Sequence, residues 1–257
     1  VGEGFIMKGT SGTDTTTING IQNNPGGKQR YDFRGKPNDG TIDISVLRGE
    51  LTLTGNPYPS SIDLEKFLTV ATNPSAVNCT GIAYFWEHDK TVNSHYIADY
   101  KGGYGSYSPA VDIYTPAVFY SYDGSGGDVT TVTSPGIVYK RKYSPIGQGF
   151  LIEGKEDATG NVQMKNSFRV FVKEGEEYNS QFEKKANTKT KKSNSETSQI
   201  RFNTLLNNGA VSQMVLAFLP ESTKGVDDAM DAESPNDGPA NNYFVINGNE
   251  YIINVLP

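Results

Sequence analysis

Hydrophobic and polar residues alternate most clearly at the start of residues 51–67. Leu51 and Leu53 alternate with threonines, and this period of two predicts a β-strand. The alternation stops at residues 55–59, which read Gly-Asn-Pro-Tyr-Pro. Glycine and asparagine tolerate unusual backbone angles and proline fixes its own, so this run predicts a sharp turn.

The pattern changes to that of a short helix after the turn. Ile62, Leu64 and Phe67 can form one buried face of such a helix. Ser60 or Ser61 is the expected cap of its first turn, because a hydroxyl oxygen there can accept hydrogen bonds from free backbone amides. The chain is therefore predicted to form a strand, a turn and a short helix in this order.

Short runs rich in tyrosine, phenylalanine, threonine and valine recur along the rest of the chain. Glycine, proline, asparagine and serine separate them, and this composition favours strands over helices. The strand candidates are residues 29–34, 41–47, 80–88 and 243–255, with further aromatic runs at 94–107 and 111–122. Asn247-Gly248 predicts a hairpin turn. The predicted fold is all-β, with β-sandwich-like or jelly-roll-like units and short helical turns.

Residues 146–154 repeat the pattern of residues 1–9, because both contain a Gly-x-Gly-Phe run followed by apolar residues. Further echoes follow in the same order, which indicates an internal duplication of a β unit. The predicted divisions are a first unit at 1–144 with an aromatic insertion at 80–144, and a second unit at 145–257 with a lysine-rich mobile loop at 184–196.

The charge of the chain restricts its partners. The 257 residues carry a net charge of −6, with a pI of about 5.0. This balance argues against nucleic acid and anionic membranes as main partners, because both repel negative charge. Cys79 is the only cysteine, so no internal disulfide can form. The sequence has no transmembrane run and no signal peptide, and it begins directly in a strand-like run, so we expect a part of a longer, processed protein.

Several short motifs follow one another from end to end of the chain. They include Gly-Asn-Pro-Tyr-Pro-Ser at 55–60 and Tyr-Phe-Trp-Glu-His at 84–88, with others at 2–10, 95–104, 147–150, 166–169, 179–182 and 225–232. Together they resemble a recurrent region of large cargo proteins of the type IX secretion system, which are bacterial cell-surface proteins and adhesins with a C-terminal sorting domain. The resemblance implies export to the cell surface or the extracellular space, by type IX machinery that recognises a neighbouring sorting domain. It does not imply an activity.

The densest group of aromatic and imidazole side chains begins in the strand candidate at 80–88. The candidate ligand-binding residues are Trp86, His88, His95, Tyr96, Tyr100 and Tyr104. Sugar rings stack on exposed aromatic faces and polar side chains bind their hydroxyls, so these residues can form a carbohydrate platform. Alternatively, the rings fill the core, because large aromatic side chains bury much area. Alternation places Tyr84 and Trp86 on one face of the strand but does not tell which face is covered.

Asp227, Asp228 and Asp231 follow Gly225 closely. Clustered carboxylates after a glycine turn suit Ca²⁺, which takes about six to eight oxygen ligands in irregular geometry. Alternatively, they mark an acidic helix start on the surface, which the helix dipole favours. Calcium is therefore a candidate cofactor, with these three residues as its ligands.

No motif in the sequence predicts catalytic residues. His88 and His95 are the only histidines, and their neighbours fit no zinc pattern. Cys79 has no third orienting group for nucleophilic chemistry, so we expect a partly buried free thiol. A nucleophile elbow, a phosphate loop and a dinucleotide fingerprint are all missing. A carboxylate pair for glycoside hydrolysis stays open, because the two acids usually come from distant strands.

Two functions are compatible with these patterns. The first is a non-enzymatic module of an exported bacterial surface protein, which serves for adhesion, ligand binding or spacing. The second is a calcium-dependent, lectin-like carbohydrate-binding module, with a polysaccharide hydrolase as its less favoured variant. In both cases the expected partner is an extracellular polysaccharide or another surface ligand.

Overall fold

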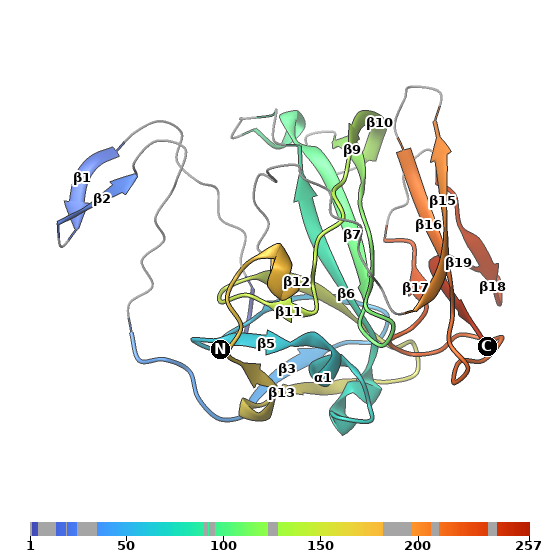
Figure 1. Ribbon diagram of the computed structural model, residues 1–257, viewed down its shortest axis with the longest axis horizontal. Coiled ribbons are helices and arrows are strands. Elements are labelled where there is room, and N and C mark those ends of the chain that lie inside the picture. The colour runs from blue at the N-terminus through green and yellow to red at the C-terminus, as the bar shows by residue number, and fades with distance from the viewer. Residues whose placement is uncertain are drawn as a thin grey trace.

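The computed structural model describes residues 2–4, 14–18, 20–24, 35–89, 92, 96–122, 128–181, 197–206, 211–235 and 241–257. These residues form mostly β structure (Figure 1). The strands are β1 (Asp14–Ile18), β2 (Ile21–Asn24), β3 (Ile42–Val46), β4 (Leu51–Gly55), β5 (Ser61–Asp63), β6 (Cys79–His88), β7 (Lys101–Ser108), β8 (Ile113–Thr115), β9 (Val118–Tyr122), β10 (Asp128–Pro135), β11 (Tyr143–Ser144), β12 (Gly149–Gly154), β13 (Gly160–Met164), β14 (Arg169–Val170), β15 (Ser198–Leu205), β16 (Val211–Phe218), β17 (Ala232–Glu233), β18 (Phe244–Ile246) and β19 (Asn249–Leu256).

The helices are short. They are α1 (Leu64–Leu68) and the 3₁₀ turns η1 (Pro74–Asn78), η2 (Ile97–Asp99), η3 (Asn166–Phe168) and η4 (Glu176–Tyr178). No helix in the described part of the chain is long and apolar enough to cross a membrane. The prediction of an all-β fold with short helical turns is confirmed.

Most of the predicted strands are present. The candidates at 41–47 and 80–88 correspond to β3 and β6, and the predicted turn at Asn247-Gly248 joins β18 to β19. The candidate at 29–34 and the predicted lysine-rich loop at 184–196 lie outside the described residues.

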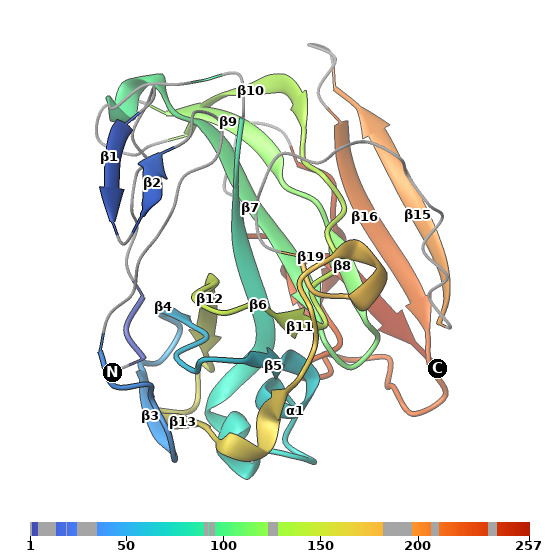
Figure 2. The same cartoon turned by 60° about the vertical axis from the view of Figure 1, so that its left-hand side comes forward.

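A seven-stranded sheet runs through the middle of the molecule, and we call it the central sheet (Figures 1 and 2). Its order is β10-β9-β7-β6-β12-β4, with β8 paired to β7. Side chains of β6 alternate between two buried clusters. Ala83 and Phe85 belong to one cluster, whereas Ile82 and Tyr84 belong to the other. Strand β6 is therefore covered on both faces by other parts of the chain.

The first face of the central sheet packs on α1 and on the small sheets that β3, β5 and their partners form. Phe67 of α1 lies against Phe150 of β12, with ring centroids 6.2 Å apart and planes at 62°. Phe85 of β6 and Ile44 of β3 belong to the same buried cluster. Burial of such large side chains stabilises each by about 1.5–3 kcal/mol.

The second face packs on a separate sheet, which we call the C-terminal sheet. Its order is β15-β16-β19-β17, with β18 paired to β19, and β16 runs parallel to β19. Val215 of β16 and Ile253 of β19 are fully buried in one cluster with Ile82 of the central sheet. Figure 1 shows the two sheets beside each other. This packing of sheet on sheet confirms the predicted sandwich-like character.

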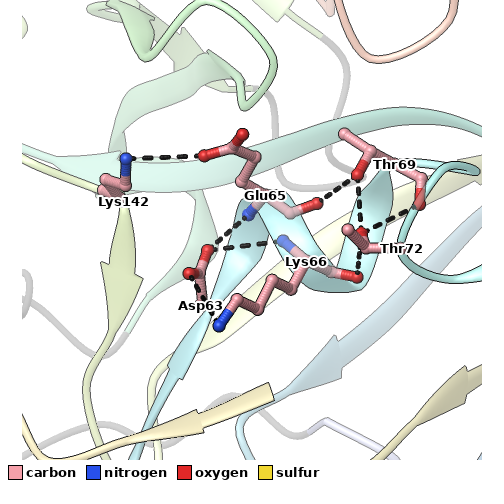
Figure 3. A network of polar contacts seen from close by, with 6 residues as sticks. All are labelled: Asp63, Glu65, Lys66, Thr69, Thr72 and Lys142. Carbon is pink, nitrogen blue, oxygen red and sulfur yellow. Dashed lines mark hydrogen bonds and ion pairs between the residues drawn. The ribbon is translucent and has the colours of Figure 1, made fainter. Parts of the chain in front are cut away.

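Residues 51–67 form the predicted strand, turn and short helix in this order, but the helix begins at Leu64, so Ile62 lies in β5 and not on the helix face. Leu64 and Phe67 are fully buried, as expected. The cap of α1 is Asp63 and not a serine: its Oδ1 accepts hydrogen bonds from the backbone N–H groups of Glu65 at 3.1 Å and Lys66 at 3.3 Å (Figure 3). The serine prediction was wrong because Ser61 already belongs to β5, so the helix begins later than the turn suggests.

Sheets cross the predicted boundary between residues 144 and 145. Strand β12 lies between β4 and β6, and β13 pairs with β3. The two predicted units therefore do not each hold their own sheets. Gly4 and β12 nevertheless lie on either side of β4, because Gly4 N donates to Leu53 O and Leu151 pairs with Leu53. The duplication itself stays a prediction.

Candidate functional site

The predicted aromatic residues continue one face of the central sheet beyond its buried part. Trp86 and His88 follow Tyr84 on the same face of β6, since side chains alternate along a strand. Tyr84 is buried against the C-terminal sheet, whereas Trp86 and His88 are only half-buried. Antiparallel pairing places Tyr104 of β7 opposite Trp86. Tyr104 still packs against the buried cluster between the sheets, whereas Trp86 and His88 are less buried than Tyr84.

The rings of this group contact one another edge to face or at a tilt. The Trp86 and Tyr104 centroids are 5.1 Å apart with planes at 67°, and Trp86 and Tyr122 are 5.8 Å apart with planes at 45°. His88 and Tyr100 form a second pair, at 5.5 Å and 71°. Such geometries are favourable for aromatic pairs. We call Trp86, His88, Tyr100, Tyr104 and Tyr122 the aromatic patch.

A glycine makes room for the indole ring. A Cβ atom at Gly102 would clash with the backbone oxygen of Glu87 and would lie 2.7 Å from Cζ2 of Trp86, so a larger residue would displace both the β6 backbone and the ring. The Tyr122 hydroxyl donates to the carbonyl oxygen of Gly102 at 3.1 Å. Gly102 itself is opposite His88 in the β6–β7 ladder. The missing side chain therefore lets Trp86 and Tyr122 lie close to the backbone of β7.

The opposite face of β6 is fixed by a buried carboxylate. Glu87, between Trp86 and His88 in sequence, is 1% exposed. Its Oε1 accepts from the Tyr114 hydroxyl at 2.7 Å and from the Ala117 N–H at 3.0 Å, and its Oε2 accepts from the Ile137 N–H at 2.7 Å. A buried carboxyl group with three hydrogen-bond donors around it is held firmly, so the backbone under the aromatic patch has a defined position.

The structure brings together four of the six predicted ligand-binding residues: Trp86, His88, Tyr100 and Tyr104. Tyr96 is 76% exposed and lies just before η2. His95 lies outside the described residues. Tyr122 was missed, although it ends the aromatic run at 111–122, because nothing in the sequence shows that β9 lies beside β7.

The three aspartates predicted to bind calcium already have partners. Asp231 is buried and accepts from the backbone N–H groups of Asp227 and Val255, each at 2.7 Å. Asp228 forms an ion pair with Lys155. Burial raises the pKa of Asp231 to about 6, although both amide hydrogen bonds oppose this rise. Among the described residues, no group of three or more His, Cys, Asp or Glu side chains is placed to hold a metal ion. Calcium binding stays a prediction.

Cys79 is a free and fully buried thiol. It begins β6 and His88 ends it, so roughly 30 Å separates them at the usual rise of a strand. Burial raises the pKa of Cys79 to about 11, which keeps the thiol protonated. These two residues therefore cannot act together as a nucleophile and its base.

A family match extends over almost the whole chain. Residues 1–256 match a family described as a domain of unknown function, DUF8693. The chain belongs to this family. No curated protein and no solved structure matches it. Because the DUF8693 description names no activity, a function for this domain must be argued from its aromatic patch and its surfaces.

Proposed function

We propose that this DUF8693 domain is a non-enzymatic carbohydrate-binding module of a bacterial surface protein that the type IX system exports. The supporting observation is the half-buried Trp86, which packs against Tyr104 and Tyr122 on the face of a rigid sheet. Binding sites on strands hold their side chains more precisely than sites on loops. The aromatic patch is the proposed contact surface for sugar.

The chemistry of the aromatic patch suits sugars. The C–H groups of a sugar ring pack on the face of an indole or phenol ring, and tyrosine hydroxyls and imidazole nitrogens can bind its hydroxyls. Tyr104 and Tyr122 supply hydroxyls beside the Trp86 ring, and Tyr100 and His88 extend the surface along β6. An apolar surface with a few polar groups is typical of small-ligand sites.

The tilt between the aromatic rings favours a soluble polysaccharide as the ligand over a crystalline one. Planes at 67° and 45° cannot lie together on the flat surface of a crystalline polysaccharide. A single sugar or a twisted chain in solution can instead contact two rings at once. We therefore propose soluble extracellular polysaccharides, and not crystalline fibres, as the ligand class.

A binding screen tests this function. The isolated domain is assayed on soluble polysaccharides and oligosaccharides, with crystalline cellulose and chitin as the insoluble arm. Trp86→Ala is expected to weaken binding at least tenfold, which corresponds to about 1.4 kcal/mol. Phe171→Ala is the matched control, because Phe171 is a fully exposed ring outside the aromatic patch. Unchanged binding by a folded Trp86→Ala protein would refute the role of the patch.

Two further arms separate the alternatives. Repeating the screen with calcium and with a chelator tests the predicted role of Asp227, Asp228 and Asp231, because loss of binding with chelator would make the module a calcium-dependent lectin. Absence of binding to every glycan, with an unchanged melting curve, would leave an adhesion or spacer unit without a sugar ligand.

A specific pair of carboxylates supports hydrolysis as the second candidate. Tyr84 donates to Glu153 Oε2 at 3.3 Å, and Tyr251 donates to Glu233 Oε1 at 2.9 Å. Burial, followed by the nearby charge of Glu233, raises the pKa of Glu153. A carboxyl group with a raised pKa suits the role of general acid, and Glu233 supplies the second carboxyl group that glycoside cleavage needs. Release of reducing ends by the domain, abolished in Glu153→Gln, would favour this candidate.

A further inference from the structure

Arg141, in the segment between β10 and β11, is a buried cation that is only 2% exposed. The carbon at the centre of its guanidinium group, Cζ, lies 4.2 Å from the ring centroid of Phe85 in β6 and 4.3 Å from that of Tyr139. The ring centroid of Tyr114 is 5.4 Å away. A guanidinium group keeps its charge in proteins, so three aromatic rings surround a permanent positive charge.

The charge of Arg141 has no direct counter-ion within the chain. None of the ion pairs between the residues that the structure describes includes Arg141. The buried carboxyl group of Glu87, on the same face of β6 as Phe85, directs its oxygens to the three donors described above. A buried charge without a counter-ion destabilises the folded state, so this position favours a negative charge.

One edge of the Arg141 guanidinium group is free to bind an acceptor. Nη1 donates to the carbonyl oxygen of Gln181 at 3.0 Å. Nε and Nη2 are buried and have no hydrogen-bond partner in the described part of the chain. These two nitrogens share one edge of the planar group, so their N–H bonds point to the same side. Such a fork binds an anion with two charge-assisted hydrogen bonds.

Ser180 lies across from Arg141 and offers a third donor. Backbone hydrogen bonds of 3.0 Å join residues 140–143 to residues 179–181 on either side of this pair. Ser180 is fully buried, as Arg141 is, so both side chains point into the protein. The Oγ atom of Ser180 has no hydrogen-bond partner among the described residues either. Two buried side chains that face each other thus have three polar atoms without a partner.

We propose that Arg141 and Ser180 bind a small anion, of the size of chloride, at the free edge of the guanidinium group. The Nε–H and Nη2–H groups of Arg141 and the hydroxyl of Ser180 donate to it. A water molecule accepts the same hydrogen bonds but does not neutralise the guanidinium charge, which favours an anion between aromatic rings. The burial of both residues excludes a large anion such as a sugar acid.

The anion site is separate from the aromatic patch. Phe85 and Trp86 are neighbours in β6 and therefore point to opposite faces of the central sheet. The anion binds on the Phe85 side, where it joins the segment before β11 to residues 179–181. Its expected effect is on the stability of the fold, and this effect does not require a sugar ligand.

Urea unfolding at constant ionic strength tests the proposal, with sodium chloride replacing sodium gluconate, whose anion is too large for the site. Above the dissociation constant, each tenfold increase in chloride should raise the folding equilibrium constant about tenfold. Arg141→Met should remove this response. No response to chloride in the native chain, or an undiminished response in Arg141→Met, would overturn the proposal.

A pair of serine variants keeps the test decisive if Arg141→Met does not fold. Ser180→Ala should weaken chloride binding about tenfold, because it removes one hydrogen bond to a charged group. Ser144→Ala is the matched control, because Ser144 is also a fully buried serine whose hydroxyl has no partner among the described residues. Equal chloride responses in the two variants would overturn the assignment of the site.

Crystals of the native chain grown with sodium bromide provide a test that needs no variant. Bromide is close to chloride in size and scatters X-rays anomalously, so its position can be distinguished from that of water. The expected result is an anomalous peak within hydrogen-bond distance of Nε and Nη2 of Arg141. A water molecule at this place, or bromide at the protein surface alone, would overturn the proposal.

Discussion

Gly81 of β6 and Ala229 lie backbone against backbone. A Cβ atom at Gly81 would lie 2.8 Å from both the backbone nitrogen and the Cβ of Ala229. The Ala229 N–H donates to the carbonyl oxygen of Thr80 at 2.9 Å. Both residues have positive φ angles, +79° at Gly81 and +61° at Ala229. This contact joins the central sheet to the segment between β16 and β17.

Gly81→Ala is expected to destabilise the protein by about 2–4 kcal/mol, because it adds a backbone clash to an unfavourable φ angle. The control is Gly40→Ala, which has the similar φ of +83° but no atom within 4 Å of the added Cβ. The control should cost only about 1 kcal/mol. Chemical denaturation measures both values. Equal costs at the two sites would show that the contact with Ala229 is unimportant.

Gly102→Ala is expected to move the indole ring of Trp86, because the added Cβ would crowd both that ring and the backbone oxygen of Glu87 in β6. Trp86 is the only tryptophan in the chain, so its fluorescence reports on the patch alone. We expect a red-shifted emission and at least tenfold weaker sugar binding. Gly149→Ala is the control, because its added Cβ would be 3.5 Å from the nearest atom, an ordinary contact. An unchanged emission spectrum in Gly102→Ala would contradict the predicted crowding.

The buried Asp231 makes stability depend on pH. Its pKa is about 6 in the folded chain, above the ordinary value of 3.8. The folded chain therefore binds the proton more tightly, so the contribution to stability is full below about pH 4 and is lost as pH rises through 6. The expected loss is about 3 kcal/mol.

Asp231→Asn removes this titration. The amide nitrogen cannot accept a hydrogen bond, whereas the hydroxyl oxygen of the protonated carboxyl group at pH 4 still can, so the variant should be less stable at pH 4. The stability advantage of the native protein should then shrink as pH rises toward 7. Urea denaturation at several pH values measures the two curves. Parallel curves would show that Asp231 does not titrate in this range.

The Asp63 cap contributes to the stability of the helix that packs on Phe150. Asp63→Ala removes the acceptor for the Glu65 and Lys66 amides and should cost about 1 kcal/mol. Asp63→Asn keeps an oxygen at the same place and should cost much less. Similar losses in both variants would assign the effect to the negative charge and not to the cap. The melting temperature of each variant is the simplest measurement.

Much of the local structure follows from short-range patterns. The alternation at Leu51 and Leu53 predicted β4, and the apolar spacing at Leu64 and Phe67 predicted the buried face of α1. Asn247-Gly248 predicted the hairpin turn between β18 and β19. These patterns involve neighbours in the chain, whose geometry depends on backbone angles and side-chain periodicity alone. The cap of α1 was misplaced because two turn residues, Ser60 and Ser61, have the same chemistry as a cap.

The exposure and the neighbours of the aromatic patch depend on long-range packing. The sequence determined that Tyr84, Trp86 and His88 share one face of a strand, because side chains alternate. Only the tertiary structure decided that Tyr84 is buried against the C-terminal sheet while Trp86 is half-buried, and that β9 brings Tyr122 beside Trp86. The insertion of β12 between β4 and β6 was equally invisible in the sequence. Backbone hydrogen bonds between strands are alike for nearly all residue types, so they do not determine which strands pair. Strand pairing depends instead on how the whole core is buried.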